Sequence, residues 1–304
     1  MIDRLKYILL NRNGVLDKPQ INTSESEANK LIFSALESKK PILIARFGAF
    51  EIGIAKGVAT PMTLNNIIKL IKGEISSIGY NKKLANSFCN NAGFFPNNHT
   101  LIERFAKLLI KDMCECDILG SWQPAEKFFS TQLEGCIKIS VRDLEPFHHV
   151  NPWTKALAGK KILIIHPYED SIRHQWKIRD KLFPTRDYLP EFDLQIIKAV
   201  QSAAGARNNF KTWFEALDYM KSEIDKRDFD IALIGCGAYG FHLGAHVKRI
   251  GKKAVHLGGF LQILFGIMGK RWDGKYDFVN DYWIRPLPSD IIKNAQSIEN
   301  GCYW

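Results

Sequence analysis

Residues 229–272 read FDIALIGCGAYGFHLGAHVKRIGKKAVHLGGFLQILFGIMGKRW. The apolar run Ile231–Ile234 predicts a buried strand, and a helical pattern begins near Phe241. A second predicted strand, Lys253–Leu257, follows that helix. Glycines stand at both strand ends, namely Gly235, Gly237, Gly240, Gly258 and Gly259. Because glycines let backbone N–H groups approach an anion and a helix N-terminus adds partial positive charge, this order of elements predicts a phosphate-binding crevice.

The spacing G-x-G-x-x-G at 235–240 also matches the dinucleotide fingerprint. Its position near the end of the chain argues against a dehydrogenase. The following strand ends in His256 and Leu257, where a ribose-binding acid is expected. A purely structural role, in which the glycines only permit tight turns, stays open at this point.

Composition narrows the class of protein. The chain has 304 residues and 46% hydrophobic residues, enough for a sizeable core in one large or two modest domains. The longest apolar stretch, Gly258–Met268, falls short of the roughly 20 residues that a membrane span needs. The start, MIDRLKYILLNRNGVL, lacks the long apolar region of a signal peptide, so we expect a cytoplasmic protein. The six cysteines lack zinc-like spacing and are expected to be free thiols.

The net charge of +10 and pI of about 9.2 indicate an acidic partner. A nucleotide diphosphate, a lipid diphosphate and an anionic membrane, contacted peripherally, all fit this charge. Nucleic acid is not expected, because the Lys and Arg residues are dispersed and no known nucleic-acid module is present.

Strand-like and helix-like segments alternate along the chain, which predicts an α/β fold. The strands read as continuous apolar runs, typical of a mainly parallel, Rossmann-like sheet with helices on both faces. The expected strands are 41–45, 117–119, 137–139, 161–166, 194–199, 231–234 and 253–257, and the expected helices are 24–36, 65–78, 100–112, 168–182 and 210–227. A loop at 145–159 would divide a single domain, 1–304, into lobes 1–150 and 151–304.

Polar side chains follow three of the other predicted strands, where α/β sheets place their chemistry. Arg46 and Glu51 follow the first strand, and Arg can hold a phosphate bidentately. Glu51 can serve as a general base, a metal ligand or an acceptor for sugar hydroxyls, or it can form a structural pair with Arg46. His166 and Glu169 follow the 161–166 strand, and Trp122 follows the strand at 117–119.

The hexapeptide RFGAFE at 46–51 resembles the R-F/Y-G-D-G-E signature of the GT-D-type glycosyltransferases, which have their own Rossmann-like fold. The blocks HPYEDSI, WFEAL, GCGAYGFHLGAHVKRIGKKAVHLGG and GKRW resemble GT-D-like proteins of bacterial surface-polysaccharide gene clusters. The resemblance covers roughly residues 25–285. It implies a transferase that uses a nucleotide-sugar donor, with UDP-sugar favoured, and a glycan or lipid-linked acceptor.

The resemblance also suggests roles for individual residues. Glu51, His166 and Glu169 compete for the role of general base. The expected donor-binding residues are Arg46, Gly48, Gly235, Gly237, Tyr239, Gly240, His242, Gly258, Gly259, Lys270 and Arg271. The family's D-x-E pair is associated with a divalent metal, Mn or Mg, which leaves Glu51 as the expected metal ligand.

Ala49 stands at the Asp position of D-x-E, so this metal site is weakened. Cationic side chains, with Arg46, Lys252, Lys270 and Arg271 as candidates, would then replace the metal at the leaving diphosphate. Two other classes stay open: a non-catalytic sugar-nucleotide-binding protein of a glycan assembly complex, and a Rossmann-like methyltransferase or oxidoreductase.

Overall fold

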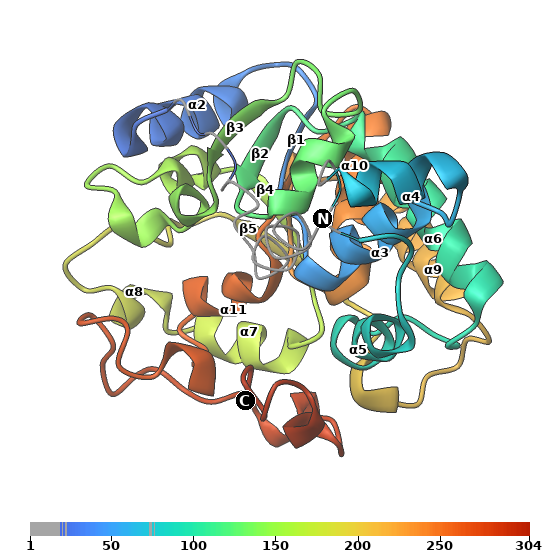
Figure 1. Ribbon diagram of the computed structural model, residues 1–304. Helices are drawn as coiled ribbons and strands as arrows, with labels where there is room; N and C mark the ends of the chain where they lie inside the picture. Colours follow the sequence, from blue (N-terminus) through green and yellow to red (C-terminus); the bar gives the residue numbers. More distant parts are fainter. Residues whose placement is uncertain (1–18, 20, 22, 73–74, 76) are drawn as a thin grey trace.

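The computed structural model describes residues 19, 21, 23–72, 75 and 77–304. Within them, seven strands form one sheet in the order β3-β2-β1-β7-β6-β4-β5, and every pairing is parallel. Figure 1 shows the helices arranged around this sheet. The strands are β1 Ile42–Ala45, β2 Ile118–Ser121, β3 Ile137–Ser140, β4 Lys161–His166, β5 Asp193–Lys198, β6 Ile231–Ile234 and β7 Lys253–His256. The predicted parallel α/β sheet is therefore confirmed.

Successive strand residues point to opposite faces of the sheet, and an apolar core lies on each face. Helices cover both cores. In β4, Leu163 and Ile165 enter one core while Ile162 and Ile164 enter the other. The first core is closed by α3 Ala49–Ala59, α5 Lys82–Ala92, α6 His99–Met113, α9 Trp213–Asp225 and α10 Gly240–Arg249. The second is closed by α2 Glu25–Glu37, α7 Glu169–Trp176, α8 Arg179–Leu182 and α11 Leu261–Leu264.

The last strand of the sheet, β7, lies between β1 and β6. The chain runs outward from β1 to β3 and then begins again at β4, so the direction of winding reverses near the centre of the sheet. Ligands of open α/β sheets bind outside the carboxyl ends of the strands at such a reversal. We therefore expect a ligand site at the carboxyl ends of β1, β7, β6 and β4.

Local sequence signals explain several element boundaries. Helix α2 begins after Ser24, whose side chain and that of Glu27 form a reciprocal capping box. Helix α9 begins at Trp213 rather than at residue 210, because the Thr212 side chain caps it. The predicted helix 168–182 is divided into α7 and α8. The predicted helix 65–78 appears as α4, Leu64–Ile71, and residues 73, 74 and 76 lie outside the described part.

Helix α3 was not predicted, since Gly53 and Gly57 weaken its helical pattern. Gly57 has a packing reason, because a Cβ at this position would lie 2.7 Å from the Cβ of Tyr80. The stretch 145–159 is more ordered than the expected loop. Its Trp153 is fully buried, and the Trp153 backbone N–H donates to Asn29 of α2. None of the described helices is long and apolar enough to cross a bilayer.

Candidate functional site

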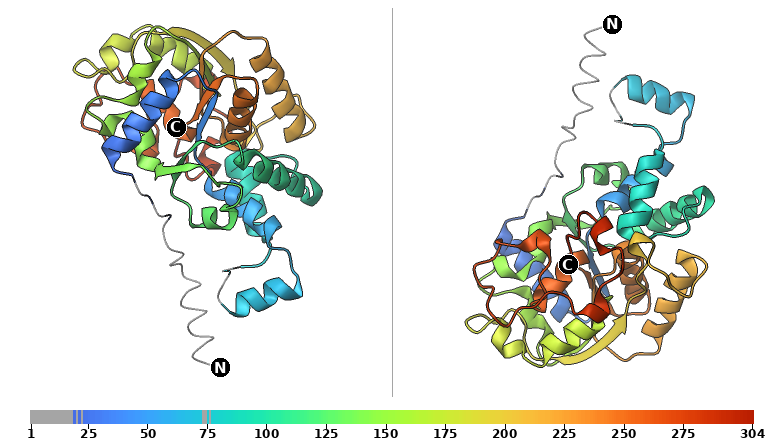
Figure 2. Two further views of the ribbon diagram at one scale, coloured as in Figure 1. Left: turned by 90° about the horizontal axis from the view of Figure 1, so that it is seen from above. Right: turned by 90° about the horizontal axis from the view of Figure 1, so that it is seen from below.

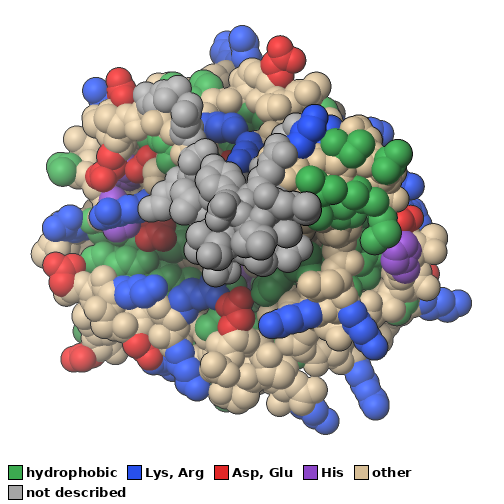
Figure 3. Space-filling view, viewed as in Figure 1, with side chains coloured by type: hydrophobic (Ala, Val, Ile, Leu, Met, Phe, Trp, Pro, Cys, Tyr) green, Lys and Arg blue, Asp and Glu red, His purple; other side chains and the backbone are tan. Residues whose placement is uncertain are grey.

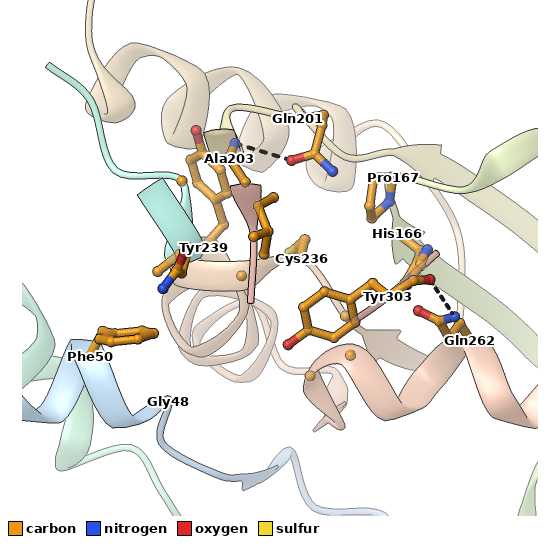
Figure 4. Close-up of a pocket in the computed structure, with 18 of the residues that line it drawn as sticks. Gly48, Phe50, His166, Pro167, Gln201, Ala203, Cys236, Tyr239, Gln262 and Tyr303 are labelled. Carbon is orange, nitrogen blue, oxygen red and sulfur yellow. Dashed lines mark hydrogen bonds between the residues drawn. The ribbon is translucent and has the colours of Figure 1, made fainter. Parts of the chain in front are cut away.

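A cavity of about 200 Å³ lies at the carboxyl ends of β1, β4, β6 and β7 (Figure 4). Most of the site residues predicted from the sequence line this cavity. They are Arg46, Gly48, Glu51, His166, Gly235, Gly237, Tyr239, Gly258, Gly259 and Arg271. Segments from both halves of the chain thus meet at one site, as the topology requires.

Arg46 follows β1 and lines the cavity, and contacts with Phe47 and Trp122 hold its side chain in place. Its Nη2 donates to the carbonyl of Phe47 at 3.0 Å, and its guanidinium carbon lies 4.8 Å from the centre of the Trp122 ring. Trp122 donates from Nε1 to the same carbonyl at 2.9 Å. Burial lowers the pKa of Arg46, while Tyr303 and Glu51 act in the opposite direction. An arginine stays charged in proteins, so the cavity contains a fixed, poorly solvated cation.

Gly258 is needed beside this cation. Its φ of +65° is in the left-handed region, and a Cβ there would lie 3.0 Å from Nη1 of Arg46. The second glycine-bearing strand end therefore serves the packing of Arg46.

Glu51 lies in the first turn of α3, where the helix N-terminus faces the cavity. Its carboxylate folds back over Gly48, and a Cβ at Gly48 would overlap the Glu51 side chain. Burial raises the pKa of Glu51, while a backbone hydrogen bond and the nearby Arg46 oppose that rise. A half-buried carboxylate with a raised pKa beside a cation is suited to accept a proton.

His166 is the other candidate base that lines the cavity. Burial lowers its pKa to about 3, so the ring is neutral. Nδ1 accepts a hydrogen bond from the Tyr168 backbone N–H at 3.0 Å, which assigns the proton to Nε2. In this tautomer His166 is a hydrogen-bond donor, and the geometry does not suit it to act as a base.

The glycines of the 235–240 turn face protein atoms. A Cβ at Gly235 would lie 2.6 Å from the carbonyl of Gly258, and one at Gly237 would lie 2.7 Å from the carbonyl of Ala92. Gly237 also has a φ of +57°, and a Cβ at Gly240 would overlap the His256 ring. Tight packing therefore accounts for these glycines without a ligand. Replacing Gly237 with Val would disturb α5 whether or not a phosphate binds nearby.

Four nominated residues do not line the cavity. Gly240 packs against His256, as described above. His242 lies within α10, where its Nδ1 is 2.7 Å from Asp112 in the first core. Glu169 accepts from Nε of Arg173 one turn along α7, at 2.9 Å. Lys270 donates to Gln296 at 3.2 Å.

Lys252 is also excluded as a replacement for the metal. It immediately precedes β7, at the amino end of the sheet, and its Nζ donates to the Phe229 carbonyl at 2.7 Å. The site is at the opposite end of the strands.

The chain's final residues contribute side chains that the sequence analysis missed. The Tyr303 hydroxyl accepts from Nη1 of Arg271 at 3.1 Å, and its carbonyl accepts from Gln262 at 3.1 Å (Figure 4). Glu299 pairs with Nη2 of Arg271. No periodic pattern marks residues 298–304, so no sequence signal could have placed them over the strand ends.

Ser202 and Gln201 were missed for a similar reason, since both lie in the loop that follows β5. The Ser202 hydroxyl donates to the Gly93 carbonyl at 2.6 Å and lies 3.0 Å from the Tyr239 hydroxyl. Tyr239 in turn stacks on Trp213, with ring centres 5.0 Å apart. These contacts fix the wall of the cavity nearest α5.

The residues present do not fit a divalent metal. Glu51 and Glu299 are the carboxylates on the cavity wall, and Glu299 already pairs with Arg271. Ala49 offers no side-chain oxygen. Across the described ranges, no group of three or more His, Cys, Asp or Glu residues is arranged to hold a metal ion. A hard cation requires several fixed oxygens, and this wall does not supply them.

No model of a known protein family and no curated protein matches the chain. Two solved structures do. One is the selenomethionine-substituted structure of domain of unknown function 1792, at 14% identity and a TM-score of 0.34. The other is described as the highly conserved domain of unknown function 1792 with a distinct glycosyltransferase fold, at 14% identity and a TM-score of 0.36. Each match covers 84% of this chain and 82% of the other.

Because both TM-scores lie below 0.5, the functional proposal below rests on the residues of the cavity.

Proposed function

We propose that the protein is a glycosyltransferase that takes a sugar from a nucleotide diphosphate, a UDP-sugar in the first instance. The acceptor would be a glycan or a lipid-linked saccharide in bacterial surface-polysaccharide synthesis. One observation carries the proposal: Arg46, Arg271 and Glu51 face a single cavity at the strand ends of a parallel sheet. Two cations suit a diphosphate, and a carboxylate of raised pKa suits a hydroxyl that must lose its proton.

The reaction can be written with these residues alone. An acceptor oxygen attacks the anomeric carbon of the donor, and the bond from that carbon to the phosphate oxygen breaks. The diphosphate leaves with the electron pair, and the proton of the acceptor hydroxyl passes to Glu51. Arg46 and Arg271 stabilise the charge that develops on the leaving phosphate.

Other cavity residues would orient the donor. His166 would donate from Nε2 to a phosphate or sugar oxygen, because its Nδ1 is engaged by Tyr168. The indole of Trp122 is 38% exposed and lines the cavity, so a nucleobase or sugar ring can pack against it. Gly235, Gly237 and Tyr239 would contact the donor through the cavity wall that they form.

A thermal-shift screen of nucleotide sugars and nucleotides, with and without manganese, tests the proposal. A ligand in excess over its dissociation constant raises the melting temperature by mass action. We expect UDP-sugars to stabilise the parent protein and Arg46→Ala to lose most of that shift. NAD and S-adenosylmethionine serve as comparison ligands, and stabilisation by either one instead would refute the proposal.

A second candidate is a non-catalytic protein that binds sugar nucleotides in a glycan assembly complex. Ala49 favours it, because the position that is acidic in D-x-E has no functional side chain here. The two candidates differ in turnover. A protein that binds UDP-sugar but neither transfers nor hydrolyses it over a broad acceptor screen would be the binding protein.

A further inference from the structure

An arm projects from the body of the molecule between α3 and α5. Its base is closed by a hydrogen bond from the Gly79 N–H to the Thr60 carbonyl, at 2.7 Å. Between these residues lies helix α4, in which no residue is buried. Figure 2 shows this helix set off from the remainder of the fold. The arm, residues 60–79, is described here for 60–72, 75 and 77–79.

The helix of the arm is amphipathic, and its apolar side chains belong to neither of the two cores formed by the described residues. Leu64, Ile67, Ile68 and Ile71 recur at the spacing of one helix face, and all four are exposed. Met62, just before the helix, is 83% exposed, and Leu64 is 75% exposed. Hydrophobic side chains gather over α4 in Figure 3.

Such a surface calls for an explanation. Single exposed apolar residues are ordinary, whereas a contiguous set on one protruding element marks an interaction site. The helix cannot gain stability from the cores of this domain, because its apolar side chains enter neither of them.

We propose that the arm docks on an anionic lipid surface, with the apolar side of α4 in the interface. Its shape favours this partner, because a protruding ridge enters a fluid, flat surface without needing a matching groove. Its charge agrees: the arm contains Lys69 and Lys72 against one acid, Glu74, Lys82 and Lys83 follow its base at the start of α5, and the whole chain has a net charge of +10. Helices that lie in lipid interfaces combine these two features.

Docking through the arm would bring the site near the bilayer. Helix α3 links the two, because Ala49 lines the cavity and Ala59 precedes the base of the arm. Its 11 residues span roughly 16 Å. If the proposed function holds, the acceptor is then a saccharide whose lipid anchor stays in the membrane, whereas lipid docking by itself needs no catalysis.

Vesicle co-sedimentation tests the proposal without donor or acceptor present. We expect the full chain to sediment with vesicles of phosphatidylglycerol and phosphatidylcholine, more weakly with pure phosphatidylcholine, and less as salt is raised. Ile67→Ser/Ile68→Ser should reduce binding by about tenfold or more, because two apolar side chains no longer enter the interface. Lys69→Gln should produce a smaller loss that disappears at high salt.

Val150→Ser is the matched control, since Val150 is 93% exposed but lies away from the arm, beside α2. It should bind vesicles like the parent protein. Unchanged melting temperatures would show that the arm variants fold, and donor binding by calorimetry would report on the proposed function separately. Vesicle binding that ignores the arm substitutions would overturn the proposal. So would a parent protein that does not bind vesicles but forms a dimer that Ile67→Ser/Ile68→Ser dissociates, because the occupant is then a second copy.

Discussion

Charged side chains meet in two regions on either side of the glycine-rich turn, and their partners differ. Behind α10, Asp112 accepts from Arg249 and pairs with His242, while Arg249 also donates to Glu115 at 2.9 Å. At the cavity, Glu51 and Arg46 face open space, and Nε of Arg46 has no partner among the described residues.

This difference distinguishes charged groups that stabilise the fold from charged groups that are available to a ligand. Burial tends to raise the pKa of Asp112, but hydrogen bonds from His242 and Arg249 and the charge of Arg249 prevail and lower it, as expected for a carboxylate whose partners are in place. Burial prevails at Glu51 and raises its pKa. In the sequence, His242 and Arg46 are equally plausible anion-binding residues beside glycines. Only their partners in space show which charges remain open to a ligand.

The largest expected effect is on turnover in Glu51→Gln. The amide keeps the shape of the side chain but cannot accept the acceptor's proton, so kcat should fall by about a hundredfold or more. Donor affinity, measured by calorimetry, should change much less.

The pH profile gives an independent check on this residue. Because the pKa of Glu51 is raised, the parent's activity should be lost on acidification at a pH above the ordinary glutamate range. Equal kcat in Glu51→Gln and parent would leave this carboxylate with a structural role like that of Asp112.

The next effect is on stability in Asp112→Ala. This variant leaves the buried His242 ring without the acceptor of its Nδ1–H and removes one of the two carboxylates that pair with Arg249. A buried donor left without its acceptor costs about 1–3 kcal/mol. Urea unfolding should report this loss, with donor affinity unchanged in the folded protein.

The stability effect of Asp112 should depend on pH. The folded-state pKa of Asp112 is lowered, so its contribution is complete above the ordinary aspartate pKa and is lost as pH falls through the folded value. The difference between variant and parent should therefore narrow in acid. A variant of normal stability but weakened donor binding would reverse the assignment of the two regions.

Arg46→Ala should weaken donor binding by about ten- to hundredfold, the range for a lost hydrogen bond to a charged group. Lys252→Ala is the matched control, because Lys252 lies at the other end of the sheet. Calorimetric titration with UDP-sugar compares the two variants. Equal losses would mean that net positive charge, rather than the position of Arg46, determines affinity.

The sheet was predictable from the sequence, whereas part of the candidate site was not. Apolar strands and their alternation with helices predicted the sheet, because burial on both faces leaves a continuous apolar run. Motifs next to strand ends, such as Arg46 and Gly235, lie together on the cavity wall because parallel strands share one carboxyl edge. His242 was predicted to bind the donor, but its side chain points to Asp112 on the other side of α10. Neighbouring residues of a helix point in different directions, and the motif alone does not show which of them faces the cavity. Tyr303 depends on where an irregular segment packs, and no local pattern encodes that.

A smaller effect concerns the neutral histidines of the cavity. The folded-state pKa of His166 is about 3, well below the usual histidine value, so the unfolded chain binds the proton more readily. Stability should therefore fall as pH drops from the ordinary histidine range towards that folded value. His166→Asn keeps an acceptor for the Tyr168 N–H and should flatten this dependence in melting curves. The variant will keep part of this pH dependence, because the pKa of His256 is also lowered to about 3. An unchanged slope in the variant would show that His166 contributes nothing to acid sensitivity.

The smallest expected effect is that of metal removal. The carboxylates of the cavity wall are Glu51, whose pKa is raised, and Glu299, which pairs with Arg271. Arg46 faces the cavity with its Nε unpaired among the described residues, and Arg271 lines the same cavity while it pairs with Glu299. These cations would stabilise a leaving diphosphate without a metal, so activity should persist in EDTA or fall only slightly. Ala49→Asp tests the reason, because residue 49 lines the cavity in the first turn of α3, where an added acid is compatible with the helix dipole. This variant should gain a response to manganese that the parent lacks.

Complete loss of the parent's activity in EDTA, restored by low micromolar manganese, would contradict the prediction. Glu299 would then be the first ligand to test, ahead of Asp170, which lies 3.8 Å from Lys198 and does not line the cavity.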